Sequence, residues 1–193
     1  MLEFRYSQSC KGRNMTTYFI SDTHFGHAHI IDLCGRPWGT VEAMDRDLIG
    51  LWNARVGPDD HVYHLGDFSY RNATSPKTYL RKLNGRKHLI IGNHDYKSLL
   101  KTPDVASCFE SIDSALSITA PDGRRAFLCH YPLADPPKHV WSLYGHVHNN
   151  REWPGFELVR DQPLSLNCCA DINGYMPVTL EELIANNEQW RKG

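Results

Sequence analysis

The sequence predicts an α/β domain in which strands alternate with helices early in the chain and strands predominate later. Short apolar runs suited to buried strands recur along the chain, and the first two flank a stretch, 40–56, with apolar residues at helical spacing. Two further runs, 115–119 and 125–129, are separated by a Pro-Asp-Gly turn and predict a hairpin. We expect one domain over residues 15–193, preceded by a disordered N-terminal extension over 1–14.

Local signals predict each element in turn. The helix over 40–56 begins at Thr40, a favourable N-cap, and carries Glu42 in its first turn, where a negative charge complements the helix dipole. The elements expected after it are a strand at 61–65, a helix at 76–83 begun by Ser-Pro and stopped by Asn-Gly, a strand at 87–91, a short helix at 97–101, the two hairpin strands, a loop or hairpin rim at 149–163, a strand at 164–170 and a terminal helix. Thr179 and Glu182 form a capping box that opens the terminal helix.

Five of the apolar runs end in polar side chains that can bind metal. These side chains are Asp22 and His24 after the first run, Asp67 after the second, Asn93, His94 and Asp95 after the third, His130 after the fourth, and His146 and His148 after the fifth. Ligands of open α/β sheets bind outside the carboxyl ends of the strands. We therefore expect these side chains to meet in one pocket. On an extended backbone, His146 and His148 would point to the same face.

The chemistry of this donor set indicates metal-dependent phosphate ester hydrolysis. Seven residues are candidate ligands: Asp22, His24, Asp67, Asn93, His130, His146 and His148. Oxygen and nitrogen donors without cysteine suit Mn, Fe, Zn or related divalent ions. Seven ligands are too many for one tetrahedral zinc but are about right for two ions that share a carboxylate. Such pairs, roughly 3.5–4 Å apart, stabilise the attacking and leaving oxygens of an in-line phosphoryl displacement.

The five motifs, in this order from residue 22 to residue 148, resemble the signature of the calcineurin-like metallophosphoesterases. The stretch from Asp22 to His27, with Arg36-Pro37-Trp38 after it, is similar to the small single-domain members found in bacteria and phages. The resemblance implies a β-sandwich core flanked by α-helices. It also implies hydrolysis of a phosphodiester or phosphomonoester by in-line attack of a metal-bridging hydroxide.

The resemblance implies a role for each residue. One ion would be held by Asp22, His24, Asp67 and His148, and a second by Asp67, Asn93, His130 and His146, with manganese the first expectation and Fe, Zn, Ni, Co or Mg the alternatives. His94 would give a proton to the leaving group or stabilise the transition state, and Asp95 would orient His94. His27 has no fixed role: it would touch the substrate phosphate, support a ligand or cap the following helix.

Two alternatives stay open. The first is a nuclease acting on single-stranded nucleic acid by the same chemistry, for which the only hints are Trp153 and a basic cluster, residues 81–87. The second is a non-catalytic interaction scaffold on the same fold, which the complete set of candidate ligands argues against. A nucleotide is one candidate substrate.

Charge, hydrophobicity and cysteine spacing argue against several classes of protein. The net charge of −1 argues against a protein that coats nucleic acid or anionic membranes through bulk charge. No apolar run is long enough to span a bilayer, residues 1–14 do not resemble a secretory signal, and nothing indicates an obligate protein partner, so we expect a cytoplasmic protein. Six cysteines without a regular spacing predict free thiols.

Overall fold

The computed structural model describes residues 15–70, 74–120 and 122–193. The predicted N-terminal extension, residues 1–14, and Pro121 of the predicted hairpin turn lie outside the described residues. The strands are β1 (Thr17–Ile20), β2 (His61–His64), β3 (Arg86–Ile90), β4 (Ser111–Asp113), β5 (Ala115–Thr119), β6 (Arg125–Cys129), β7 (Trp141–Tyr144) and β8 (Ser165–Asn167). The helices are α1 (His29–Cys34), α2 (Val41–Arg55), α3 (Pro76–Leu80), α4 (Asp95–Ser98), α5 (Phe156–Arg160) and α6 (Leu180–Lys192), with short 3₁₀ turns at Val105–Cys108 and Ala170–Ile172.

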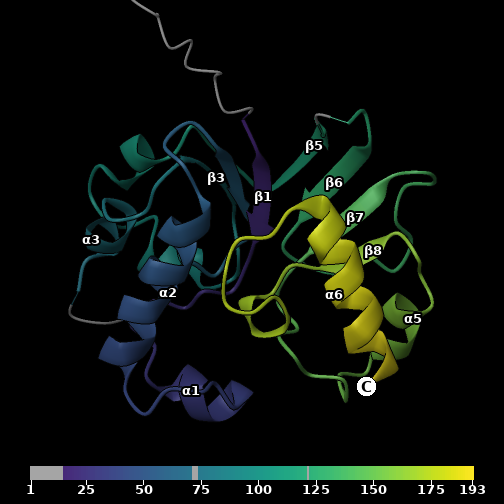
Figure 1. Cartoon of the computed structure of the whole chain (residues 1–193), viewed down its shortest axis with the longest axis horizontal. Coiled ribbons are helices and arrows are strands. Elements are labelled where there is room, and N and C mark those ends of the chain that lie inside the picture. The colour runs from purple at the N-terminus through teal and green to yellow at the C-terminus, as the bar shows by residue number, and fades with distance from the viewer. Residues whose placement is uncertain (1–14, 71–73, 121) are drawn as a thin grey trace, which may run out of the picture.

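The strands form two four-stranded sheets. The first has the order β1-β2-β3-β4 and is parallel throughout, whereas the second has the order β5-β6-β7-β8 and is antiparallel only between β5 and β6. Helices α2 and α3 lie beside the first sheet, and α5 and α6 lie beside the second (Figure 1). The predicted β-sandwich flanked by helices is confirmed, as is the antiparallel hairpin of β5 and β6.

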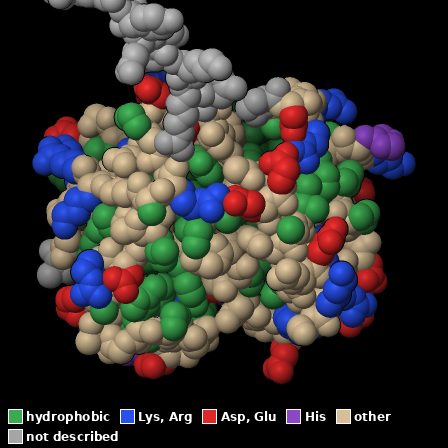
Figure 2. All heavy atoms as spheres, in the orientation of Figure 1, with side chains coloured by type: hydrophobic (Ala, Val, Ile, Leu, Met, Phe, Trp, Pro, Cys, Tyr) green, Lys and Arg blue, Asp and Glu red, His purple; other side chains and the backbone are tan. Residues whose placement is uncertain are grey.

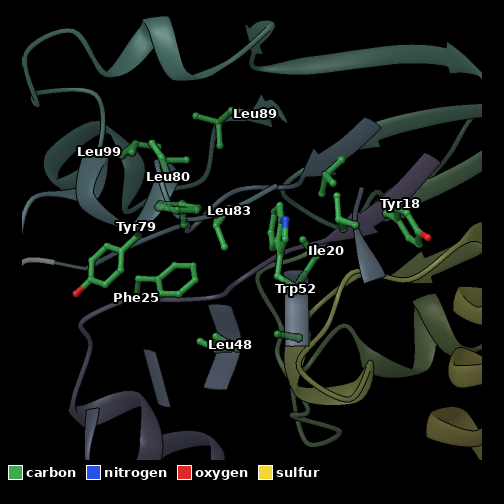
Figure 3. Close-up of a cluster of buried hydrophobic side chains, with 14 of the residues drawn as sticks. Tyr18, Ile20, Phe25, Leu48, Trp52, Tyr79, Leu80, Leu83, Leu89 and Leu99 are labelled. Atoms are coloured by element: carbon green, nitrogen blue, oxygen red, sulfur yellow. The ribbon is translucent and has the colours of Figure 1, made fainter. Parts of the chain in front are cut away.

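Strand β1 is buried on both faces because its side chains alternate between two hydrophobic clusters. Tyr18 and Ile20 pack with Trp52 of α2 in the first cluster, part of which Figure 3 shows. Phe19 points the other way and packs with Leu128 of β6 in the cluster between the sheets. The two faces of one strand therefore bind the outer helix layer and the second sheet.

The two sheets meet where β1 and β8 end. The N–H of Ser21 donates to the carbonyl of Cys168 at 2.9 Å, and the N–H of Ala170 donates back to the carbonyl of Ser21 at 3.0 Å. This bridge continues the hydrogen bonding of β1 across to the end of β8. The carboxyl ends of strands from both sheets are thereby brought to one place.

The predicted helix caps are present. The hydroxyl of Thr40 accepts from the N–H of Ala43 at the start of α2. At the start of α6, Thr179 and Glu182 form the reciprocal capping box. Glu182 also accepts from Arg55 at the end of α2, with both carboxylate oxygens within 2.7 Å of Nη2. This ion pair joins the last turn of α2 to the first turn of α6.

Three sequence expectations need correction. The stretch 149–163, expected as a loop or hairpin rim, contains helix α5, whose Phe156 and Val159 are buried. Helix α3 ends at Leu80 rather than near residue 83, because a turn precedes Asn84. The short helix after the third strand occupies Asp95–Ser98, earlier than the expected 97–101. The five cysteines in the described ranges are free thiols, as expected.

Charged side chains of both signs are interspersed over the face shown in Figure 2. The basic cluster that hinted at a nuclease lies around the amino end of β3, where Arg86 donates to Glu110 and Lys87 donates to the carbonyls of Leu83 and Gly85. The metal-competent residues follow the opposite end of this strand, about 13 Å away at the usual rise per residue. The cluster therefore lies at the end of β3 opposite the site, and its half-buried Lys87 is engaged by backbone carbonyls. In the described part of the chain, no helix is long and apolar enough to cross a membrane.

Candidate metal centre

The structure brings all seven predicted ligand residues together at the carboxyl ends of strands from both sheets. They occupy the loops after β1, β2, β3, β6 and β7. Five of them have left-handed backbones with φ between 51° and 74°: Asp22, His24, Asp67, His146 and His148. The expectation that His146 and His148 share the face of an extended strand is wrong, because β7 ends at Tyr144 and both histidines lie in the turn that follows.

One group of candidate ligands comprises Asp22, His24 and His148, with donor atoms within 4.8 Å of one another. The Oδ1 atom of Asp22 lies 3.9 Å from Nε2 of His24 and 3.8 Å from Nε2 of His148. These distances are too long for hydrogen bonds. They resemble the separations between ligands that share one ion about 2.1 Å from each.

A second group comprises Asp67, His130 and His146, again within 4.8 Å. The Oδ1 atom of Asn93 adds an oxygen to it, because it lies 3.0 Å from both Nε2 of His130 and Nδ1 of His146. The Nδ1 atom of His130 donates to the carbonyl of Leu65 at 2.7 Å, which leaves Nε2 of this ring directed at the group.

Asp67 lies between the two groups. Its Oδ2 atom is 3.8 Å from Nε2 of His24 in the first group and 3.6 Å from Nε2 of His130 in the second. Its Oδ1 atom accepts from the backbone N–H of His94 at 2.8 Å, which fixes the carboxylate plane. A single carboxylate thus faces both sets of donors.

Two buried atoms at the centre fit a bound cation. Within the described residues, neither Oδ1 of Asp22 nor Nε2 of His24 has a hydrogen-bond partner. Both side chains are at most 2% exposed. An unpaired buried carboxylate oxygen beside an unpaired imidazole nitrogen is destabilising unless a ligand occupies the space between them. The donor set therefore fits a divalent ion at this position.

The electrostatic surroundings give the carboxyl groups of Asp67 and Asp22 different pKa values. Burial and the nearby charge of Asp22 raise the pKa of Asp67 to about 7. Burial also opposes ionisation of Asp22, but the neighbouring His148, His130 and His24 lower the pKa of Asp22 well below its usual value. Two close carboxylates repel each other, and cations bound between them would favour the ionised form of both.

The carboxylate of Asp95, predicted to orient His94, accepts hydrogen bonds from the backbone. Its two carboxylate oxygens accept from the backbone N–H groups of Gly92, Asp67 and Phe68 at 2.8, 2.8 and 3.0 Å. The side chain is buried between the loops after β2 and β3. Asp95 therefore fixes the backbone that presents Asp67.

His27 contacts a candidate ligand. Its Nδ1 atom lies 3.3 Å from Nδ1 of His24, and its ring stacks on Tyr70 with centroids 3.9 Å apart. Burial and the nearby His94 lower the pKa of His27 to about 4. Of the three roles considered for His27, support of a ligand is the one with a direct contact, whereas the N-cap position of α1 belongs to Ala28.

The sequence pattern indicated no role in the site for Arg36 and Asp171, whose side chains are buried behind it. Asp171 accepts from Nδ1 of His148 at 2.8 Å and from Arg36 at 2.8 and 3.1 Å. Arg36 also donates to the carbonyls of Asp22 and Thr23 at 2.7 and 2.9 Å. Burial opposes protonation of His148, but the Asp171 hydrogen bond outweighs it and raises the pKa of His148 to about 11. A cation at Nε2 would displace that proton.

Two glycines allow the loops to approach closely. A side chain at Gly92 would overlap Oδ1 of Asp67 and lie 3.0 Å from its Cγ. A side chain at Gly145 would lie 2.5 Å from Oδ2 of Asp22 and 2.6 Å from Oγ of Ser21. Both loops can supply ligands only because these positions carry no Cβ.

Two cavities open beside the site. The larger, about 480 Å³, is lined at one end by His24, His94, His146 and His148. The smaller, about 340 Å³, is lined by His94 as well and by Lys97. His94, whose side chain is 39% exposed, borders both. The site is thus reachable by a molecule larger than an ion.

Comparison with known proteins gives consistent matches. The family model described as calcineurin-like phosphoesterase matches residues 15–181. The chain is 32% identical over 173 residues to the uncharacterized protein MJ1445 of Methanocaldococcus jannaschii, a match that covers 86% of this chain and 88% of that protein. It is 39% identical over 85 residues to the Gene 66 protein of Mycobacterium phage L5, covering 41% of this chain and 39% of the phage protein. The solved structure of the protein of unknown function AQ665 from Aquifex aeolicus aligns with a TM-score of 0.68 and 30% identity, covering 88% of this chain and 97% of that one.

Proposed function

Because the chain belongs to the calcineurin-like phosphoesterase family, we propose that it hydrolyses a phosphodiester or phosphomonoester with two divalent ions bound at the candidate metal centre. The observation that supports two ions is the position of Asp67, whose Oδ2 atom faces His24 of one ligand group and His130 of the other. A carboxylate in that position is suited to bridging.

The first ion would be held by Asp22, His24, Asp67 and His148, and the second by Asp67, Asn93, His130 and His146. When bound, the two ions would activate water for in-line attack and neutralise charge on the phosphoryl oxygens. We propose manganese as the metal, with Fe, Zn, Ni, Co and Mg compatible with the same mixed oxygen and nitrogen donors.

His94 is the proposed proton donor to the leaving group. Its backbone N–H is held by Asp67, and its Nε2 atom lies 3.9 Å from Oδ2 of Asp67 at the edge of the ligand groups. The ring borders both cavities, so it would face a phosphate bound between them. A proton from His94 would neutralise the alkoxide that forms as the ester bond breaks.

Hydrolysis of bis-p-nitrophenyl phosphate with added manganese tests the proposal. We expect turnover by the native chain and a loss of at least about a hundredfold in Asp67→Asn, because replacing even an outer partner of a metal ligand commonly lowers affinity or activity 10- to 100-fold. Asp59→Asn, at an exposed position, is the matched control and should retain full activity. Equal rates for native protein and Asp67→Asn would refute the assignment and favour the scaffold alternative.

A further inference from the structure

The lining of the larger cavity beside the site combines two kinds of side chain. Histidines of the candidate metal centre form part of it, and Ile30, Leu33, Cys34, Val147 and Trp153 supply apolar and sulfur-bearing walls. Asn149 joins two walls of the cavity, because its side-chain amide donates to the carbonyl of Cys34 at 2.8 Å and so links α1 to the loop after β7. A molecule with its phosphate at the histidines would extend its other part toward Trp153.

The walls of this cavity carry no formal charge apart from what the histidines acquire. Among the described residues that line it, there is no Lys, Arg, Asp or Glu, and the polar side chains besides the histidines and Cys34 are the amides of Asn149 and Asn150. A second phosphate would find no cation there, which disfavours a polyphosphate or a continuous nucleic acid strand. Neutral amides and apolar walls instead fit an uncharged group that has hydrogen-bonding edges.

Trp153 is held in a defined position in this wall. The benzene part of its indole packs directly on Gly155, where a Cβ would lie 2.7 Å from Cζ3 and closer still to Cη2 and Cζ2. Trp153 also packs against the buried cluster of Tyr144, Val147 and Val159. A large flat side chain fixed on one side and bordering a cavity is a stacking surface that loses little entropy when a ring binds.

We propose that this cavity binds an uncharged heteroaromatic ring, of the nucleobase type, carried by one arm of the phosphoester, and that Trp153 stacks on that ring. The cavity volume of about 480 Å³ lies within the range of small-molecule sites. The inference rests on the proposed function, since the phosphate of the same molecule would lie at the candidate metal centre. Trp153 is thereby a specificity-determining residue of this site.

Calorimetric titration of the manganese-loaded full chain tests the proposal without turnover. The three probes are adenosine 5′-phosphonate, ribose 5-phosphonate and hexylphosphonate, whose phosphorus–carbon bonds resist hydrolysis. Because stacking of a base on an aromatic side chain commonly strengthens binding about tenfold or more, we expect the adenosine compound to bind about tenfold tighter than the ribose compound. Hexylphosphonate should bind more weakly than the adenosine compound.

Three variants separate stacking from general damage. In Trp153→Ala, the affinities for the adenosine and ribose compounds should differ by no more than about twofold. Trp153→Phe should keep part of the preference for the adenosine compound. Gly155→Ala should also weaken the preference, because the backbone at φ −92° accepts alanine and the atoms nearest to the added methyl group are those of the Trp153 ring. Gly39→Ala, with no atom within 4 Å of the added Cβ, is the control and should bind like the native chain.

Several results would overturn the inference. These are equal affinities for the adenosine and ribose compounds in the native chain, hexylphosphonate binding as tightly as the adenosine compound, or a preference that persists in Trp153→Ala. If ribose 5-phosphonate binds to the manganese-loaded chain and the adenine ring of the adenosine compound gives no tighter binding, only the ring site is refuted. If the adenosine preference is present but no ester is hydrolysed, only the proposed function is refuted.

Discussion

His148 donates from Nδ1 to the carboxylate of Asp171 at 2.8 Å, and this bond directs Nε2 of the ring toward Asp22. Asp171 is held in turn by Arg36, whose side chain is completely buried. Proteins commonly fix the tautomer and orientation of a metal-binding histidine in this way, with a carboxylate bonded to one ring nitrogen and the ion at the other. Arg36 and Asp171 are therefore positioning residues for His148.

Asp171→Asn should weaken manganese binding at the site that includes His148 by about 10- to 100-fold, because the amide no longer holds the proton on Nδ1. Calorimetric titration of manganese into the metal-free protein measures this. Asp161→Asn, an exposed carboxylate paired with its neighbour Arg160, is the control and should bind manganese normally. Native manganese affinity in Asp171→Asn would show that the bond is dispensable.

Gly92→Ala should lower phosphoesterase activity by about a hundredfold, because the methyl group displaces the Asp67 carboxylate and displacements of about 1 Å can have effects of that size. The matched control is Gly50→Ala in α2, where the added methyl group meets no atom within 4 Å. That change should leave activity unaltered and stabilise the fold by about 0.5–1 kcal/mol. Rates with p-nitrophenyl esters and urea denaturation provide the two readouts, and full activity in Gly92→Ala would contradict the close packing.

Asp95→Asn should destabilise the protein by at least about 2 kcal/mol, because an amide cannot accept from the N–H groups of Gly92, Asp67 and Phe68 as a carboxylate does. Denaturant unfolding measures the loss, with Asp104→Asn at an exposed position as the control. If Asp95 instead acted by orienting His94, the variant would keep its stability and change only the pH profile of hydrolysis.

Glu182→Gln should lower stability at neutral pH but not in acid. Partial burial alone would raise the pKa of Glu182, but the hydrogen bonds from Arg55 outweigh it and lower this pKa below 4.5. The stabilisation is therefore present above pH 4.5 and is lost as the pH falls through the lowered pKa of the folded protein. Since the Glu182 side chain is 41% exposed, we expect Glu182→Gln to lower the free energy of unfolding by only about 0.5–1 kcal/mol at pH 7.

Glutamine can still complete the capping box with Thr179, so Glu182→Gln isolates the charge from the cap. Thermal melts of both proteins between pH 3 and pH 8 should converge at the acid end. A difference in melting temperature that stays constant across this range would contradict the pKa assignment and implicate the cap instead.

Local signals predicted the elements well because they depend on near neighbours. The caps at Thr40 and Thr179 are set within four residues, and the apolar runs before Asp22 and Asp67 are strands as expected. Helix α5 was missed because five residues after Gly155 give too short a pattern to separate from a turn.

The sequence predicted the candidate ligands of the site but not the residues that hold those ligands in position. Asp171 is 135 residues from Arg36 and 23 from His148, and no spacing rule connects positions so far apart. The left-handed backbone of His146 and His148 was also beyond reach, because alternation along a strand was assumed to continue past Tyr144. The way the two sheets pack together depends on contacts in the cluster that contains Phe19 and Leu128, which a one-dimensional pattern does not contain.

The left-handed φ angles of Asp22, His24, Asp67, His146 and His148 limit which amino acids an engineer can install there. Asp, Asn and His are among the few residues with a Cβ that adopt this conformation readily, whereas β-branched and bulky side chains do so only with strain. Backbone shape and coordination chemistry therefore select the same few side chains. Redesign toward a thiolate-preferring metal such as cadmium would require new loops as well as new ligands.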